Sequence, residues 1–340
     1  MHQPLIALGL YQCESSLRSR AVQNHDDLVV TPFLEFISAR VPDADLAAAV
    51  SEAGGMGFIG AGGGSPDWLR DQIRAVRERT NRPFGVGFIS SFPGLDELVQ
   101  IALDEHVAVV CHSFADPSPY VAAAHDAGVK VLAQVQKVSH AKKVALAGVD
   151  AIAAQGTEAG GHTGHSGTLP LVPAVIDVVG DIPVIAAGGI ADGRGLAAVL
   201  MLGAEGAFIG SRFVASLESA REDWEKQIVV KAGVDETVLT KAYDLAMGSA
   251  FPADIGDRVI RNDYTGEWHG RDAEVVAKSE ALKAQVTAAI QAKDAGTAPI
   301  RAGNAVGLIS SVEAAGELLR KIVEEAESIL RGRPSALLTT

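Results

Sequence analysis

The stretch PVIAAGGIADGRGLAAVLMLGAEGAFIGSRF, residues 183–213, decides the fold class. It begins with an apolar run, Pro183 to Ala187, of the kind expected for a parallel strand buried on both faces. Asp192 then supplies a helix N-cap, Gly203 supplies a helix stop, and Ala207 to Ile209 form a second apolar run. Strand, helix and strand in this order predict a βαβ unit of a parallel sheet.

The same unit recurs in the preceding part of the chain, where apolar runs follow one another at spacings of roughly 20 to 30 residues. These earlier runs are an initial one around Leu28 to Phe36, then Met56 to Ile59, Phe84 to Ile89, Val107 to Cys111, Val129 to Val135 and Ala151 to Gln155. Together with the last two they make eight parallel strands, which close most naturally as a barrel. We therefore predict an α/β fold, a (β/α)8 TIM barrel whose main part is residues 28–216.

The remaining segments do not follow this rhythm. Residues 1–27 show no useful periodicity and are predicted to be an N-terminal extension. Residues 217–295 contain charged, helix-like stretches, which predict a small helical insertion after strand 8. Residues 296–335 return to the barrel, and Val312 to Leu330 is expected to form a long amphipathic terminal helix on its outside.

Charge and cysteine content limit the class of partner. The chain of 340 residues has 29 basic and 42 acidic side chains, a net charge of −13, so we expect it to repel nucleic acid and anionic membranes. Its apolar stretches are all broken well before the about 18 residues of a membrane span. Cys13 and Cys111 lack CxxC spacing, which is typical of a reducing compartment and favours a cytoplasmic protein.

Two glycine clusters follow the last two predicted strands. Gly188 and Gly189 come after the seventh strand, and Gly210 with Ser211 comes after the eighth. In a barrel these loops meet at the carboxyl-terminal face, where backbone N–H groups of small residues can bind a phosphate. One such cluster could be only a tight turn, but two at corresponding places favour a phosphate site.

The loop QGTEAGGHTG, residues 155–164, directly follows the sixth predicted strand. A histidine on such a loop, His162, can act as a general base or donate a hydrogen bond to a flavin or a substrate. The alternative, a histidine of an ordinary surface loop, leaves the surrounding glycines unexplained. Glu158 could be a catalytic acid, although holding the loop by hydrogen bonds to its backbone is an equally good interpretation.

Three further features point to chemistry less clearly. His165 lies three residues after His162, but no HExxH motif or carboxylate cluster accompanies it, so we predict no metal site. The run Gly60 to Gly64 fails the spacing of a dinucleotide fingerprint, since Ser65 stands where the third glycine should be. His112 follows the fourth strand and is either a site residue or a buried structural histidine.

With these residues in view, the chain resembles the nitronate monooxygenase family, once called 2-nitropropane dioxygenases, which are FMN-dependent TIM barrels. The resemblance runs from about Ala44 to Arg331. AQGTEAGGHTG, residues 154–164, looks like the catalytic loop of the family, and residues 186–213 are similar to its flavin-phosphate segment. DLAAAVSEAGGMG, residues 45–57, looks like an early helix and turn of the family.

The resemblance implies a set of roles for individual residues. His162 would be the catalytic base, and Gln134 in VLAQV would contact the flavin ring or ribityl chain. The implied cofactor-binding residues are Gln134, Gly161, Gly188, Gly189, Gly210 and Ser211. It also implies FMN as cofactor, and the oxidation of a nitronate or small nitroalkane by O2 to a carbonyl compound and nitrite.

Two departures from the family pattern concern the flavin ring. The family usually has a Pro-Met pair near the first strand, whereas this chain reads TPFLEF over Thr31 to Phe36. In the third strand the family often has asparagine where this chain has Gly87. Three alternatives therefore stay open: an NAD(P)H-dependent enoyl or quinone reductase, a non-redox isomerase or dehydratase with His162 as base, and a non-enzymatic binding protein. A homodimer also stays open.

Overall fold

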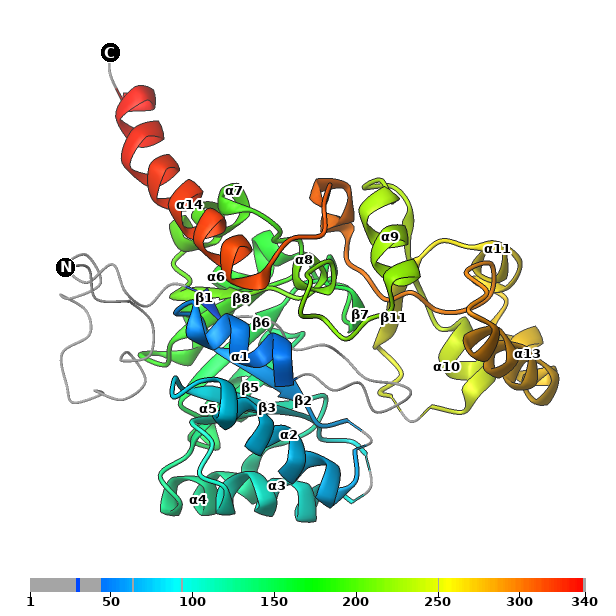
Figure 1. Ribbon diagram of the computed structural model, residues 1–340, viewed down its shortest axis with the longest axis horizontal. Coiled ribbons are helices and arrows are strands. Elements are labelled where there is room, and N and C mark those ends of the chain that lie inside the picture. Colours follow the sequence, from blue (N-terminus) through cyan, green and yellow to red (C-terminus); the bar gives the residue numbers. More distant parts are fainter. Residues whose placement is uncertain (1–28, 31–43, 63, 93, 250, 339–340) are drawn as a thin grey trace.

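The barrel sheet has eight strands, all of whose recorded pairings are parallel. The computed structural model describes residues 29–30, 44–62, 64–92, 94–249 and 251–338 (Figure 1). The strands are β1 (Val29–Val30), β2 (Gly57–Gly60), β3 (Phe84–Ile89), β4 (Val109–Ser113), β5 (Lys130–Val135), β6 (Ala151–Gln155), β8 (Val184–Ala187) and β9 (Gly206–Phe208). Their order is β1-β9-β8-β6-β5-β4-β3-β2. The predicted TIM barrel is confirmed, and most of the predicted first strand, Leu28 to Phe36, lies outside the described residues.

Helices alternate with these strands and lie outside the sheet (Figure 1). They are α1 (Ala44–Glu52), α2 (Pro66–Arg79), α3 (Leu95–Asp104), α4 (Ser118–Asp126), α5 (Val138–Leu146), α6 (Thr168–Val179), α7 (Gly193–Met201) and the terminal α14 (Ala315–Leu338). Asp192 caps α7 as predicted, because its side chain accepts hydrogen bonds from Arg194 N and Gly195 N. α5 begins at Val138, and no side chain caps its first turn.

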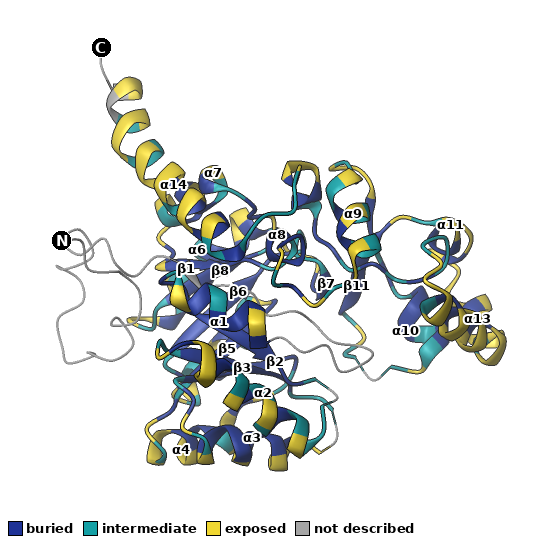
Figure 2. Cartoon of the chain, in the orientation of Figure 1, coloured by how far each residue is buried: buried dark blue, intermediate teal, exposed yellow. Residues whose placement is uncertain are grey.

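Two apolar layers hold the barrel together, and both are dark blue in Figure 2. Inside the barrel lies a small cluster that includes Phe58, Cys111, Leu132 and Phe208. Between sheet and helices lies a much larger one, to which the opposite faces of the same strands contribute. Burial on both faces explains why the strand sequences lack polar alternation.

The segment after β9 forms a separate lobe beside the barrel, at the right of Figure 1. Its elements are α8 (Ser211–Val214), α9 (Asp223–Lys231), β10 (Thr237–Thr240), α10 (Ala242–Met247), β11 (Gly256–Ile260), α11 (Asp263–Trp268), α12 (Asp272–Ala277) and α13 (Ser279–Ala292), with a 3-10 turn, η2 (Asn304–Leu308), on the way back. The insertion is mainly helical, but two strands that the sequence analysis missed lie within it. The boundaries proposed for the segments stay predictions.

These two strands connect the insertion to the barrel. β10 and β11 form an antiparallel sheet with β7 (Gly161–Thr163), a strand within the loop that follows β6. In this sheet His162 lies opposite Asp257. The loop that carries the predicted catalytic histidine is therefore ordered by a segment about 95 positions further along the chain.

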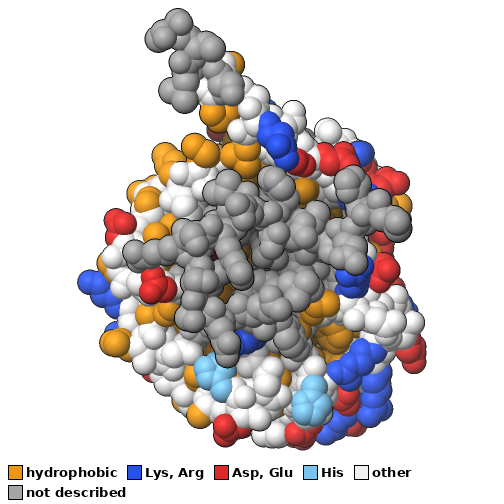
Figure 3. Space-filling model, turned by 90° about the vertical axis from the view of Figure 1, so that its left-hand side faces the viewer, with side chains coloured by type: hydrophobic (Ala, Val, Ile, Leu, Met, Phe, Trp, Pro, Cys, Tyr) orange, Lys and Arg blue, Asp and Glu red, His pale blue; other side chains and the backbone are white. Residues whose placement is uncertain are grey.

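The surface carries both signs of charge. On the face shown in Figure 3, acidic and basic side chains lie side by side around the edge. None of the helices in the described parts of the chain combines the length and the apolar character needed to cross a bilayer.

Candidate active site

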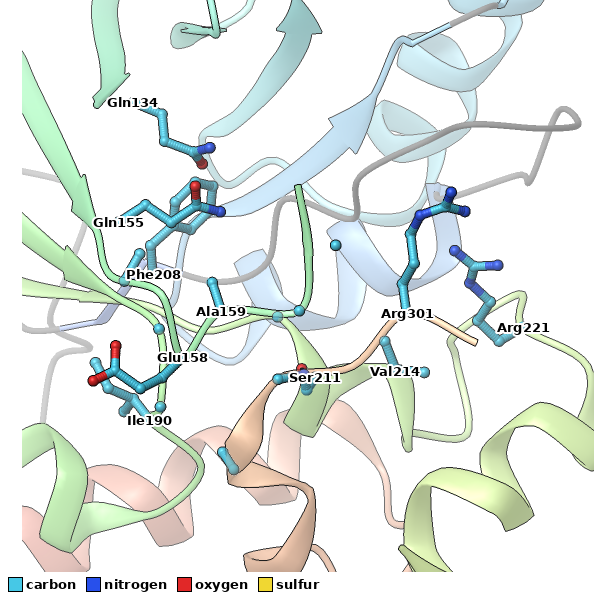
Figure 4. A pocket seen from close by; sticks show the side chains of 18 residues that line it. Gln134, Gln155, Glu158, Ala159, Ile190, Phe208, Ser211, Val214, Arg221 and Arg301 are labelled. Atoms are coloured by element: carbon cyan, nitrogen blue, oxygen red, sulfur yellow. The ribbon is translucent and has the colours of Figure 1, made fainter. Parts of the chain in front are cut away.

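A pocket opens at the carboxyl-terminal ends of the barrel strands (Figure 4). Its empty space is about 700 Å³, part of which is open solvent. It is lined by Gln134, Gln155, Glu158, Ala159, Gly160, Gly161, Ala187, Gly188, Gly189, Ile190, Phe208, Gly210, Ser211, Val214, Arg221, Arg301, Gly303 and Ala305. This end of a barrel is where ligands of such folds bind.

The pocket brings together all the residues that the sequence analysis named for cofactor binding. They are Gln134, Gly161, Gly188, Gly189, Gly210 and Ser211. These come from the ends of β5, β8 and β9 and from β7. His162, which directly follows Gly161, does not line this pocket and is fully buried.

Gly188 and Gly189 form one wall of the pocket. Both have positive φ angles, +101° and +76°, a conformation that side chains disfavour. A Cβ added at Gly188 would lie 2.9 Å from Gly156 O and 3.0 Å from Ala159 N. Glycine therefore permits the close approach of this backbone to the loop after β6, and we call Gly188 and Gly189 the glycine cradle.

The facing loop is held rigidly by polar contacts. The Glu158 carboxylate accepts hydrogen bonds from Thr168 N at 2.9 Å and from Thr168 Oγ1 at 2.8 Å. Arg258 Nε donates to Thr157 O at 2.6 Å, and Asn304 N donates to Glu158 O at 2.9 Å. The structure thus supports the loop-holding interpretation of Glu158 over that of a catalytic acid.

The opposite end of the pocket offers amide groups. Gln134 and Gln155 lie close to the ring of Phe208 (Figure 4). Gln155 Oε1 accepts a hydrogen bond from Gln136 Nε2 at 2.9 Å. The Nε2 atom of Gln134 is buried and has no hydrogen-bond partner among the described residues. A buried amide without a partner is unfavourable by about 1–3 kcal/mol, so this group is suited to donate to a ligand.

Two arginines place positive charge at the pocket. Arg221 and Arg301 lie next to each other in Figure 4, away from the two glutamines. Arg221 is 3.3 Å from Glu225, and Arg301 pairs with the fully buried Asp257 at 2.8 Å. Each arginine is thus paired with a carboxylate, and both bring guanidinium N–H groups to one side of the pocket.

His162 lies just behind the pocket wall, between a carboxylate and an aromatic ring. Its Nε2 is 3.0 Å and 3.1 Å from the two carboxylate oxygens of Asp244. The ring of Phe251 stacks on the imidazole, with centroids 3.5 Å apart and planes 7° apart. Phe114 meets the imidazole edge-on at 6.3 Å. This arrangement fixes the ring plane and shields it from water.

The other histidines that drew attention lie elsewhere. His112 is buried, with its Nδ1 2.9 Å from Ser90 Oγ and its ring stacked on Tyr120. Burial lowers the pKa of His112 to about 4, as expected for a structural imidazole. His165 is exposed, and the described part of the Gly60 to Gly64 run does not line the pocket.

The sequence profile described as nitronate monooxygenase matches residues 29–98 and 90–325. The chain belongs to the nitronate monooxygenase family. The chain is 39% identical over 206 residues to a 5-hydroxy-7a-methyl-1-oxo-octahydro-1H-indene-4-carboxyl-CoA dehydrogenase of Mycobacterium tuberculosis; the match covers 60% of this chain but only 58% of that relative. A probable nitronate monooxygenase of Staphylococcus aureus is 34% identical, over 65% of this chain and 78% of its own.

A solved relative supports the same fold. The structure of FabK from Thermotoga maritima superimposes with a TM-score of 0.80 at 36% identity, covering 91% of this chain and 96% of that chain. Relatives that share sequence or fold with this chain thus have different names, among them a dehydrogenase, a probable nitronate monooxygenase and FabK.

In this family member three acidic and imidazole groups lie close enough together to surround a cation. His162, Asp244 and Asp257 place one atom each within 4.8 Å of the others. Asp244 is already bonded to His162, and Asp257 is already paired with Arg301. These pairings satisfy the charges without an ion, and the lack of a metal site stays a prediction.

Several residues of this site escaped the sequence analysis of the family member. Asp244 is 82 positions from His162, and Phe251, Arg221 and Arg301 also belong to the insertion or follow it. No spacing motif links residues that are brought together only by tertiary structure. The one available signal was the break in the βα rhythm after residue 216.

Proposed function

We propose that this member of the nitronate monooxygenase family holds FMN in the pocket and oxidises alkyl nitronates or nitroalkanes with O2 to a carbonyl compound and nitrite. The observation that carries the proposal is a single pocket with a glycine cradle at one end and a buried amide without a described partner at the other. An elongated cofactor would place its phosphate at the glycine end of the pocket and its polar ring system at the amide end.

The cradle suits the phosphate. Gly188, Gly189, Gly210 and Ser211 all line the pocket, and their backbone N–H groups and the Ser211 hydroxyl would bind the phosphate. Backbone N–H groups of glycines and a serine hydroxyl can approach a phosphate dianion closely, because no large side chain stands in the way. Arg221 and Arg301, although paired with Glu225 and Asp257, add guanidinium N–H donors on the same pocket, which can bind an anionic ligand.

The amide end suits the flavin ring. Gln134 Nε2 would donate a hydrogen bond to a ring or ribityl oxygen, and the ring of Phe208 would pack beside it. When bound, the flavin supplies the redox chemistry, and the protein supplies position and electrostatics. Gly87 stands where the family often has asparagine, so the Gln134 amide is the main polar contact identified for the ring. The other departure from the family pattern, Thr31 to Phe36, lies outside the described residues.

His162 would serve as the base in this proposal. Its imidazole would remove a carbon-bound proton from a neutral nitroalkane, or orient a substrate that is already an anionic nitronate. The shielding by Phe251 keeps water from the ring, so a substrate has to displace that contact to reach it. Arg221 and Arg301 would attract the anionic form.

The decisive experiment is the visible absorption spectrum of the purified protein, followed by addition of a nitronate under air. A flavin spectrum, with formation of nitrite and uptake of O2, is the expected result. A colourless protein that FMN does not reconstitute would remove the redox proposal and favour the isomerase, dehydratase or non-enzymatic alternative. A homodimer and a cytoplasmic location stay untested expectations.

A second candidate keeps the flavin but changes the substrate. The 39% identity to a carboxyl-CoA dehydrogenase favours a nicotinamide-linked or thioester-directed oxidoreductase. Anaerobic addition of NADH or NADPH separates the two functions. Bleaching of the flavin by either nicotinamide, without nitrite formation from nitronates in air, would favour this second candidate.

A further inference from the structure

The imidazole of His162 is anchored by a carboxylate from the insertion. Both oxygens of Asp244 lie within 3.1 Å of Nε2, and the exposed fractions of the two side chains are 0% for His162 and 10% for Asp244. A carboxylate accepts hydrogen bonds and cannot donate one when ionised. The nitrogen facing it therefore carries the proton, in the neutral ring as well as in the charged one.

We propose that Asp244 is the positioning residue of His162, which keeps the ring proton on Nε2 so that Nδ1 is the nitrogen that accepts a proton from the substrate. This inference rests on the proposed role of His162 as base. Asp244 acts only through the imidazole, because it does not line the pocket.

The proton transfer balances without any further reactant. The C–H bond of a neutral nitroalkane breaks, its electron pair stays on the substrate to form the nitronate, and the proton moves to Nδ1. The ring becomes an imidazolium with protons on both nitrogens. The positive charge thus created lies about 3 Å from the Asp244 carboxylate, which stabilises it.

The other charged groups around the ring do not replace this carboxylate. Asp257, opposite His162 on β11, pairs with Arg301 at 2.8 Å, so its charge is compensated by a neighbour. Phe114 and Phe251 also contact the ring, and neither side chain carries a charge. Asp244 is the carboxylate that contacts the imidazole directly.

Helix α10 holds Asp244 in place from both sides. The preceding residue, Tyr243, stacks on Tyr264 with ring centroids 4.6 Å apart and donates a hydrogen bond to Thr297 O at 3.0 Å. The backbone carbonyl of Asp244 accepts from Gly248 N and Ser249 N at the end of the helix. An anchored carboxylate selects one ring orientation, which a flexible one would not.

The test uses nitrogen NMR of the whole protein, as purified, with ¹⁵N-labelled histidine. The signals of His162 are identified as those missing from His162→Gln. We expect neutral His162 to carry its proton on Nε2. In Asp244→Asn we expect that preference to weaken, because the adjacent negative charge is gone. Asp272→Asn, an exposed carboxylate of the same insertion, is the matched control and should leave the preference unchanged.

Kinetics give a second readout that a merely structural role would not produce. For Asp244→Asn, kcat/KM should fall at least about 10-fold on a neutral nitroalkane, which must lose a proton. The value for a preformed nitronate, which has no such proton to lose, should change less than about 2-fold. Flavin content should equal that of the wild type.

If the neutral imidazole of wild-type His162 carries its proton on Nδ1, the proposal is overturned. This measurement needs no folded Asp244→Asn variant. Equal losses on both substrates in a folded variant overturn it too. Failure of the proposed function looks different: the protein would lack flavin or nitronate turnover, while the ¹⁵N spectrum would still report which nitrogen holds the proton.

Discussion

Replacing Gly188 by alanine tests the cradle directly. The backbone there has φ +101°, which alone disfavours an alanine by about 1–2 kcal/mol. The new Cβ would also lie 2.9 Å from Gly156 O and 3.0 Å from Ala159 N, both backbone atoms that have to shift. We expect a total loss of about 2–3 kcal/mol in the free energy of unfolding.

The loss should be accompanied by loss of cofactor, because the shift moves the pocket wall. Urea unfolding measures the stability, and the flavin-to-protein ratio after dialysis measures retention. Gly180→Ala is the matched control: its φ is +70°, yet nothing lies within 4 Å of the added Cβ. It should lose only the part of the free energy of unfolding that comes from its backbone conformation, φ +70° and ψ −127°, and keep its flavin.

The comparison between the two variants decides the matter. If Gly188→Ala is no less stable than Gly180→Ala and retains flavin like the wild type, the close backbone approach has no role in binding. Loss of stability at Gly188 with full flavin retention would confine the role of this glycine to folding.

Three further predictions concern single side chains. His162→Gln should keep its flavin but turn over a neutral nitroalkane about 10²–10⁴-fold more slowly, and unchanged steady-state rates would remove the base from the proposal. Arg221→Gln should raise KM for an anionic nitronate about fivefold, the equivalent of about 1 kcal/mol, and high salt should reduce the difference; an unaltered KM at low salt contradicts this. Burial lowers the pKa of His112 from 6.5 to about 4, so the ring is neutral in the folded protein at neutral pH. Its contribution to the free energy of unfolding is therefore complete above pH 6.5 and is lost as the pH falls toward 4. Relative to His112→Gln, the wild type should lose up to about 3 kcal/mol over this range in urea titrations, and parallel curves would show that the ring is already accessible to protons.

Most of the barrel could be predicted because its signals are local. Buried parallel strands make continuous apolar runs, and side chains such as Ser65 and Asp192 cap helices within a few residues of themselves. Phe84 to Ile89 and Ala151 to Gln155 coincide with β3 and β6, while Val107 to Cys111 was placed two residues too early relative to β4. A sequence predicts the existence of a strand more reliably than it predicts where the strand begins and ends.

Only part of the candidate site could be predicted from the sequence. The glycines lie directly after strand ends, so topology alone brings them to one face. The partners of His162 could not be found this way, because β7 is three residues long and is stabilised by β11, whose apolar content is low. Arg258 and Asp257 on β11 are charged yet buried, since each pairs across the sheet or with the loop beside it. Such a strand resembles a surface segment until its partners are known.

The pairing of β7 with β11 also has a consequence for synthesis on the ribosome. When the chain has emerged as far as β9, every barrel strand is available, yet β11 and Asp244 are still to be made. A nascent barrel at that stage has its cradle glycines but lacks the carboxylate and the strand that order the imidazole. The loop that carries His162 therefore cannot reach its final order until the insertion has been synthesised, although all the barrel strands precede it.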